Sequence, residues 1–168
     1  LSQQPPVIGS FPADGDEFVG PFSSWINVRT AYGAVGDGAT DDTRAIRRSF
    51  DDVGRSSDSS PVLFFPAGSY RLTGTLSLSY RIHVSLVGED PERTVISWDG
   101  PNGGTMLLIN GVAYSRLTRF TFDGRGRASV AVEQSWDGGQ PHFDTGNEYS
   151  DARFVDVRYR DLIEDPLA

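Results

Sequence analysis

The chain has 168 residues and a formal net charge of −8 at pH 7, which is long enough for one domain with a sizeable core. An acidic surface repels phosphate backbones and anionic lipids, which argues against nucleic-acid and membrane-surface partners. The chain has no cysteine, so disulfides and thiolate metal sites are excluded. No apolar run approaches the roughly 20 residues that a membrane-spanning helix needs.

Two segments precede the first regular structure that the sequence predicts. Residues 1–24 contain several Pro and Gly without any period, which indicates an arm that lies along the domain or stays mobile. A short strand is expected over residues 25–28. The stretch 31–38 then carries three glycines, which indicates a loop whose backbone conformations a Cβ atom would penalise.

One convincing helix is predicted, over residues 41–53. Thr40 or Asp41 can cap the free backbone N–H groups at its start, and the acidic residues suit the positive end of the helix dipole. Apolar residues at helical spacing form a single face. These residues are Ile46, Phe50 and Val53.

After Pro61 the pattern changes to short strands. Residues 62–65 form a continuous apolar run, which is typical of a strand buried on both faces. The segments 81–88, 116–124 and 153–161 resemble one another at intervals of about 35 to 37 residues. In the first of them, Ile82, Val84 and Leu86 alternate and are expected to point inward. A repeat of strands and turns without hairpin signals predicts the coils of a parallel β-helix, and a β-sandwich is the alternative.

Two blocks of sequence resemble a known family. The first runs from Asn27 to Ile46 and contains Tyr-Gly-Ala-Val-Gly-Asp-Gly-Ala-Thr-Asp-Asp-Thr, and the second is Phe-Phe-Pro-Ala-Gly-Ser-Tyr-Arg-Leu at residues 64–72. In this order they resemble the opening signature of the pectate-lyase-like superfamily, which includes polygalacturonase-like hydrolases, rhamnogalacturonases, epimerases and viral tailspikes. The resemblance implies an all-β, right-handed parallel β-helix (a solenoid) with an N-terminal capping α-helix. Residues 25–168 would form its capped N-terminal part.

The helix over residues 41–53 suits the role of cap, because the end of a solenoid needs a polar outer face to stay soluble. Asp37, Asp41 and Asp42 have the side chains of catalytic carboxylates, but we expect them to serve the turn and the cap. The resemblance implies that the catalytic groups of such enzymes lie on the middle coils. The chain stops after an apparent strand without a second cap, so we expect a truncated piece whose catalytic residues are unknown.

A long segment from Glu133 to Tyr149 interrupts the coils and is the candidate glycan-binding site. Aromatic faces bind the C–H groups of sugars, and carboxylates and His bind their hydroxyls, while the alternative is a solvated loop. His83 is expected to be a surface residue on a strand. No spacing of His, Asp and Glu predicts a metal site. The candidate substrate-binding residues are Trp136, Asp137, His142, Asp144 and Glu148.

The resemblance implies a carbohydrate-active protein that is secreted, periplasmic or on the cell surface, and that acts on a polysaccharide or oligosaccharide. Glycoside hydrolysis and β-elimination are both open, and Ca²⁺ is expected as a cofactor only for a lyase. The charge of −8 favours a neutral or weakly charged glycan. A non-catalytic glycan-binding or tailspike-like β-helix is the alternative. The isolated piece is expected to be inactive and to self-associate through the open end of its β-helix.

Overall fold

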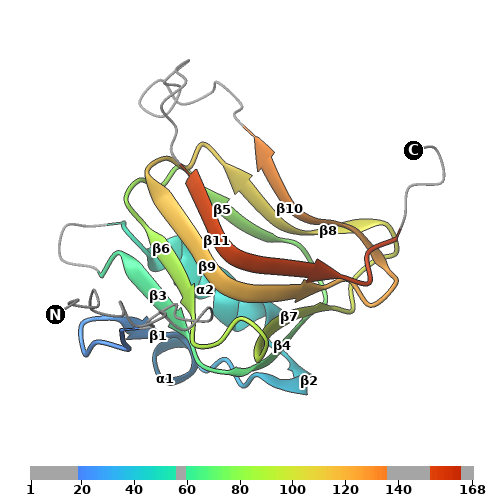
Figure 1. Cartoon of the computed structure of the whole chain (residues 1–168), viewed down its shortest axis with the longest axis horizontal. Helices are drawn as coiled ribbons and strands as arrows, with labels where there is room; N and C mark the ends of the chain where they lie inside the picture. Colours follow the sequence, from blue (N-terminus) through green and yellow to red (C-terminus); the bar gives the residue numbers. More distant parts are fainter. Residues whose placement is uncertain (1–18, 56–59, 136–151, 164–168) are drawn as a thin grey trace, which may run out of the picture.

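The structure is a parallel β-helix closed at one end by a helix (Figure 1). It is a computed structural model that describes residues 19–55, 60–135 and 152–163. Every pair of neighbouring strands runs parallel, which confirms the predicted fold class and rules out the β-sandwich. Most of residues 1–24, predicted as an arm, lie outside the described residues.

Each coil contributes strands to three columns, which form the three faces of the solenoid. The first column contains β1 (Ile26–Asn27), β3 (Val62–Phe65), β6 (Ser85–Gly88) and the first half of β9 (Ser115–Asp123). The second contains β2 (Asp37–Asp41), β4 (Gly68–Leu72), β7 (Thr94–Trp98) and the second half of β9. The third contains β5 (Leu76–Ser79), β8 (Gly104–Asn110) and β10 (Ala128–Ser135). Finally, β11 (Ala152–Arg160) pairs along the whole of β9.

The register of the first column stacks apolar residues directly on one another. Leu63 pairs with Leu86, and Leu86 pairs with Leu117. The repeat seen in the sequence is real, but its predicted alignment is wrong at one step, because Ser85 and not Arg81 lies opposite Arg116. The alternating pattern begins at Ile82, but the chain still turns there, and strand β6 begins only at Ser85.

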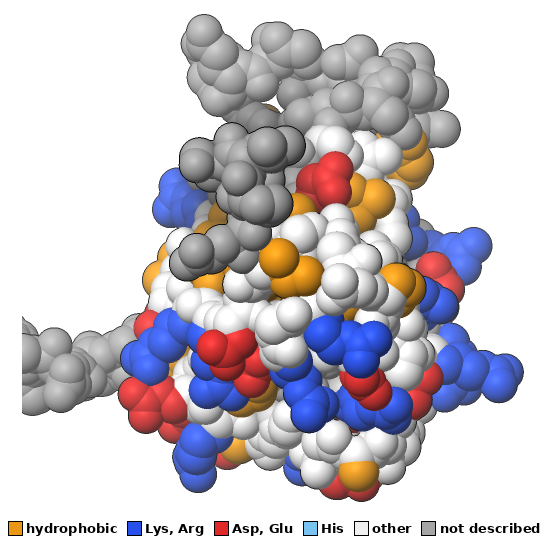
Figure 2. Space-filling view, turned by 90° about the vertical axis from the view of Figure 1, so that its right-hand side faces the viewer, with side chains coloured by type: hydrophobic (Ala, Val, Ile, Leu, Met, Phe, Trp, Pro, Cys, Tyr) orange, Lys and Arg blue, Asp and Glu red, His pale blue; other side chains and the backbone are white. Residues whose placement is uncertain are grey.

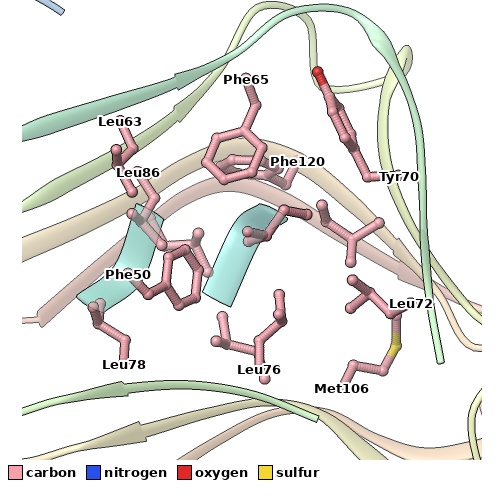
Figure 3. Packing of buried hydrophobic residues seen from close by; sticks show 14 of the residues in the cluster. Phe50, Leu63, Phe65, Tyr70, Leu72, Leu76, Leu78, Leu86, Met106 and Phe120 are labelled. Atoms are coloured by element: carbon pink, nitrogen blue, oxygen red, sulfur yellow. The ribbon is translucent and has the colours of Figure 1, made fainter. Parts of the chain in front are cut away.

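Helix α2 (Thr43–Asp52) covers the first coil, as predicted. Ile46, Phe50 and Val53 are all buried, and Phe50 lies over the interior side chains of the first coil (Figure 3). The helix begins at Thr43 and not at residue 41, because Asp41 is the last residue of β2. The Asp41 side chain nevertheless accepts a hydrogen bond from the Thr43 N–H at 3.0 Å. A polar helix over an apolar core is what caps a solenoid.

Two short elements lie where the sequence predicts a strand and a loop. The strand predicted over residues 25–28 ends at Asn27, and helix α1 (Val28–Tyr32) follows it. The Asn27 side chain accepts the Arg29 N–H, and Gly33 ends the helix with a φ of 77°. Strand β2 was not predicted, because its residues are polar and it pairs with β4 alone. The positive φ expected of the glycines in this stretch is confirmed at Gly33, Gly36 and Gly38.

Candidate functional site

The five predicted substrate-binding residues cannot be placed by the structure. Trp136, Asp137, His142, Asp144 and Glu148 lie outside the described residues, so they stay a prediction. The described residues on either side are informative: Ser135 pairs with Asn110, and Ala152 pairs with Ser115. The segment is therefore anchored where the third column of strands gives way to the first. Glu133, taken as the start of this segment, belongs to β10 instead.

The corner between the third and first columns is built from turns with unusual backbone. Tyr80, His83 and Tyr114 have φ values of 54°, 57° and 50°. This left-handed conformation costs a residue with a side chain about 1–2 kcal/mol. It is maintained by hydrogen bonds between coils, since the Tyr80 N–H donates to the Asn110 carbonyl at 2.9 Å and the His83 N–H donates to the Ala113 carbonyl at 3.2 Å. The same conformation occurs elsewhere in the coils, at Arg119, Arg125, Asp156 and Asp161, so it marks the points where the chain changes direction.

The same corner presents two stacked rings to solvent. The rings of His83 and Tyr114 lie 5.4 Å apart between centroids, at an angle of 28°. His83 is exposed, as predicted, although it lies in a turn and not in a strand. Ile82 does not point inward as predicted, because the turn leaves 46% of it exposed. Tyr114 is 49% exposed, so an aromatic surface is available to a ligand.

A row of polar side chains continues from this corner along the outer face of β5, β8 and β10. Ser79, Asn110 and Ser135 lie side by side in the register. Ser77 and Ser79 share a hydrogen bond of 3.0 Å, and the Glu133 carboxylate accepts one from the Thr105 hydroxyl at 3.3 Å. The serine and threonine hydroxyls and the Glu133 carboxylate are donors and acceptors of the kind that bind sugar hydroxyls, whereas the side-chain oxygen of Asn110 is buried. We call this row and the His83–Tyr114 pair the corner site.

The described part of the corner site contains a single carboxylate. Hydrolysis of a glycosidic bond uses two carboxyl groups on either side of that bond. Glu133 is the one acidic residue in strands β5, β8 and β10. Among the described residues, no cluster of His, Cys, Asp and Glu could hold a metal ion.

The three aspartates near α2 have structural roles, as predicted. Asp42 is 1% exposed and accepts the Val35 N–H at 2.6 Å and the Gly36 N–H at 3.0 Å. Burial raises the pKa of Asp42 above its ordinary value, although these two hydrogen bonds oppose the shift. Hydrogen bonds from Thr40 and Ala39 lower the pKa of Asp37. Burial raises the pKa of Asp41, but bonds from Thr43 and Thr73 outweigh it and the net shift is downward.

Sequence reasoning placed His83 on the surface without assigning it a function, and it missed Tyr114, its partner in the stack. A signal was present: Tyr80 and Tyr114 each lie shortly before an apolar alternation that belongs to the repeat. The bridge between Ile82 and Ala113 places His83 opposite Tyr114 in the next coil, so the coil corners, and not only the long segment after β10, can carry a binding surface.

Comparisons with known proteins agree with this architecture. The family model described as rhamnogalacturonase A/epimerase, pectate lyase-like, matches residues 25–138. A glucan 1,3-β-glucosidase of Cochliobolus carbonum is 46% identical over 54 residues, which are 32% of this chain and 6% of that protein. No helix in the described residues has the length and apolar character to cross a membrane.

Two solved structures show the same fold at low sequence identity. ORF18 of Geobacillus virus E2 has a TM-score of 0.63 and 22% identity, over 82% of this chain and 26% of that one. The A-module of the mannuronan C-5 epimerase AlgE4 of Azotobacter vinelandii has a TM-score of 0.58 and 22% identity, over 82% of this chain and 38% of that module. The chain therefore spans less than two fifths of the length of either solved relative.

Proposed function

Because the chain belongs to the rhamnogalacturonase A/epimerase, pectate lyase-like family, we propose that it forms the capped end of a β-helix that acts on polysaccharide and binds glycan at the corner site. The family and its relatives support a carbohydrate-active protein. The observation that carries the binding proposal is the exposed stack of His83 on Tyr114, at the corner from which the hydroxyl and carboxylate groups of β5, β8 and β10 continue.

The geometry suits a sugar ring for a physical reason. A pyranose has an apolar C–H face and a rim of hydroxyls, so it needs a flat aromatic surface and polar groups at its edge. Tyr114 supplies the surface. The Ser77 and Ser79 hydroxyls and the Glu133 carboxylate on the neighbouring strands supply the polar groups. A neutral or weakly charged glycan fits a chain with a net charge of −8 better than a polyanion does.

The reaction of the parent protein is a finer proposal. We propose glycoside hydrolysis or β-elimination, carried out outside the cell or at its surface, where polysaccharides are found. Glu133 alone cannot serve as both acid and base, so a second carboxyl group from another part of the protein would be required for hydrolysis. Elimination would instead require a base and a cation that neutralises the uronate.

Titration calorimetry of the 168-residue chain tests the binding proposal. A β-1,3-glucan oligosaccharide is the neutral probe and a mannuronan oligosaccharide is the anionic one. Tyr114→Ala should weaken binding of the neutral probe about fivefold, because a stacked aromatic contributes on the order of 1 kcal/mol. Phe22→Ala is the matched control, since Phe22 is an aromatic residue of similar exposure, 52%, that packs on Trp25 before β1 and belongs to neither binding site. Equal losses in the two variants, or no binding of either probe, would contradict the proposal.

A further inference from the structure

A hollow lies on another face of the β-helix, away from the corner site. It has a volume of about 420 Å³, within the range of small-molecule sites. It lies over the outer face of β11 and the second half of β9, whereas the corner site lies over the third column of strands. We call this hollow the arginine groove. Its lining residues are Glu92, Thr121, Arg158, Tyr159 and Arg160.

The strand register explains why two arginines lie together in the groove. Arg158 pairs with Thr121, and Arg160 pairs with Asp123. Residues two apart on a strand point to the same side, so both guanidinium groups project outward. The intervening Tyr159 lies at the edge of the groove, where its ring stacks on Phe122 with centroids 6.0 Å apart.

The two arginines are fixed to different degrees. Arg160 donates from Nε and Nη2 to one oxygen of Asp123, at 3.0 and 2.7 Å, and the Asp123 side chain is only 15% exposed. Arg158 donates from Nη1 to Glu92 at 2.7 Å, but the Glu92 side chain is 71% exposed. A shielded pair with two bonds fixes its arginine, whereas an exposed pair contributes little to stability.

Glu92 is brought to the groove by a specific contact. The Thr121 hydroxyl donates to the Pro91 carbonyl at 2.5 Å and so attaches the turn that carries Glu92 to β9. A guanidinium has five N–H donors, and the two carboxylates take one from Arg158 and two from Arg160. Both arginines therefore have donors left for another oxyanion. In the wider view of Figure 2, basic and acidic side chains are interspersed in a band across the lower half of the molecule.

We propose that the arginine groove binds the oxyanion of an acidic saccharide, a carboxylate or a sulfate ester, between Arg158 and Arg160. Without ligand, the exposed Glu92 carboxylate occupies the Arg158 donor that the ligand takes. Guanidinium groups match carboxylate and sulfate oxygens in geometry as well as charge. The groove is independent of the corner site, because the two share no residue, and a glycan that carries only occasional acidic groups could use both.

Because the Glu92 carboxylate competes with the ligand for Arg158, its removal should increase the affinity for acidic sugars. The 168-residue chain is titrated at constant ionic strength with glucuronate, glucose 6-sulfate, inorganic sulfate and uncharged glucose. Arg158→Gln should weaken binding of the two acidic sugars about tenfold, because it removes a charge-assisted contact. Glu92→Gln should strengthen that binding several-fold, since it removes the competing carboxylate. Arg158→Lys, which keeps the charge but not the fork of donors, should also weaken it.

Arg116→Gln is the control, because Arg116 is exposed on β9 outside the groove and its loss changes the net charge equally. An equal loss of affinity in Arg116→Gln and Arg158→Gln would overturn the proposal by showing a general charge effect. If Glu92→Gln does not bind the acidic sugars more tightly, the proposal that Glu92 competes with the ligand for Arg158 is overturned. Inorganic sulfate that binds as tightly as glucose 6-sulfate would overturn the assignment to a saccharide, and binding of glucose would overturn the assignment to an oxyanion.

Discussion

The buried carboxylate of Asp42 is hydrogen-bonded to the backbone N–H of Gly36 at 3.0 Å, and its other oxygen accepts the N–H of Val35. One side chain at the start of α2 thus connects the helix to the loop that leads into β2. The Gly36 carbonyl in turn accepts the Ser69 N–H of β4 at 2.9 Å. The cap and the first coil are joined through this loop, so the stability of the cap depends on Asp42.

Asp42→Asn should lower the free energy of unfolding by about 1–3 kcal/mol, because an amide cannot accept both N–H groups and leaves a buried donor unsatisfied. Urea denaturation measures the change. Asp51→Asn, an exposed aspartate on α2, is the control and should change it by less than about 0.5 kcal/mol. Equal effects in the two variants would show that the contact to the loop contributes nothing.

The stability should fall at acid pH, through aspartates whose pKa is lowered on folding. A hydrogen bond from Arg71 lowers the pKa of Asp99, and the pKa values of Asp37 and Asp41 are also lowered. A lowered pKa stabilises the fold above the unfolded value of 3.8, and this contribution is lost as the pH falls through the folded value. Asp42 has the opposite sign: its raised pKa favours folding at low pH and opposes it as the pH rises through the folded value.

The urea midpoint, measured at pH 7, 5 and 3, should therefore drop between pH 5 and 3, because four aspartates have a lowered pKa, Asp90 being the fourth, and only Asp42 among the described aspartates has a raised one. The urea midpoint of the Asp99→Asn variant should drop less over that interval, because this variant already lacks the stabilisation that the ionised Asp99 contributes. An equal fall of the urea midpoint in Asp99→Asn and in the unmodified chain would show that the Arg71–Asp99 pair does not contribute to the acid sensitivity.

The cap itself is tested by Phe50→Ala. Phe50 is 3% exposed over the first coil, so a change from a large to a small side chain should cost about 3–5 kcal/mol of unfolding free energy. Arg44→Ala, on the exposed side of the same helix, should cost less than about 0.5 kcal/mol. A loss below about 1 kcal/mol for Phe50→Ala would mean that the helix does not cover the core.

Self-association through β11 stays a prediction with some structural support. Phe154 and Tyr159 are 38% and 49% exposed on that strand. Exposed apolar residues on a strand edge favour pairing with another chain. Sedimentation velocity should show a mass that rises with concentration, and Phe154→Arg should reduce the rise, while Arg44→Ala should not. A monomer at every concentration would show that β11 does not mediate association.

The segment after β10 also remains testable, although its five predicted residues lie outside the described ones. Trp136→Ala should weaken glycan binding about fivefold if its ring is a stacking platform. Gln140→Ala in the same segment is the control. Calorimetry with the β-1,3-glucan oligosaccharide measures the affinity of both variants. An unchanged affinity in Trp136→Ala would favour the alternative of a solvated loop.

Local patterns predicted most of the fold. The apolar face of α2 follows from a period of 3.6 residues and β3 from a continuous apolar run, and both patterns span only a few positions. The two motif blocks then identified the superfamily. Short elements were missed for the same reason: α1 and β2 have five residues each, too few to show a period.

The corner site and the arginine groove were decided by the tertiary structure alone. Tyr114 meets His83, and Arg158 meets Glu92, only because successive coils stack in a particular register. That register depends on the length of each turn, and the turns differ from coil to coil. The sequence by itself therefore indicated a capped β-helix, through the period of its helix, the spacing of its strands and the resemblance of its two motif blocks to a known family. Which side chains share an outer face was decided by stacking, because contacts between coils join residues far apart in the chain.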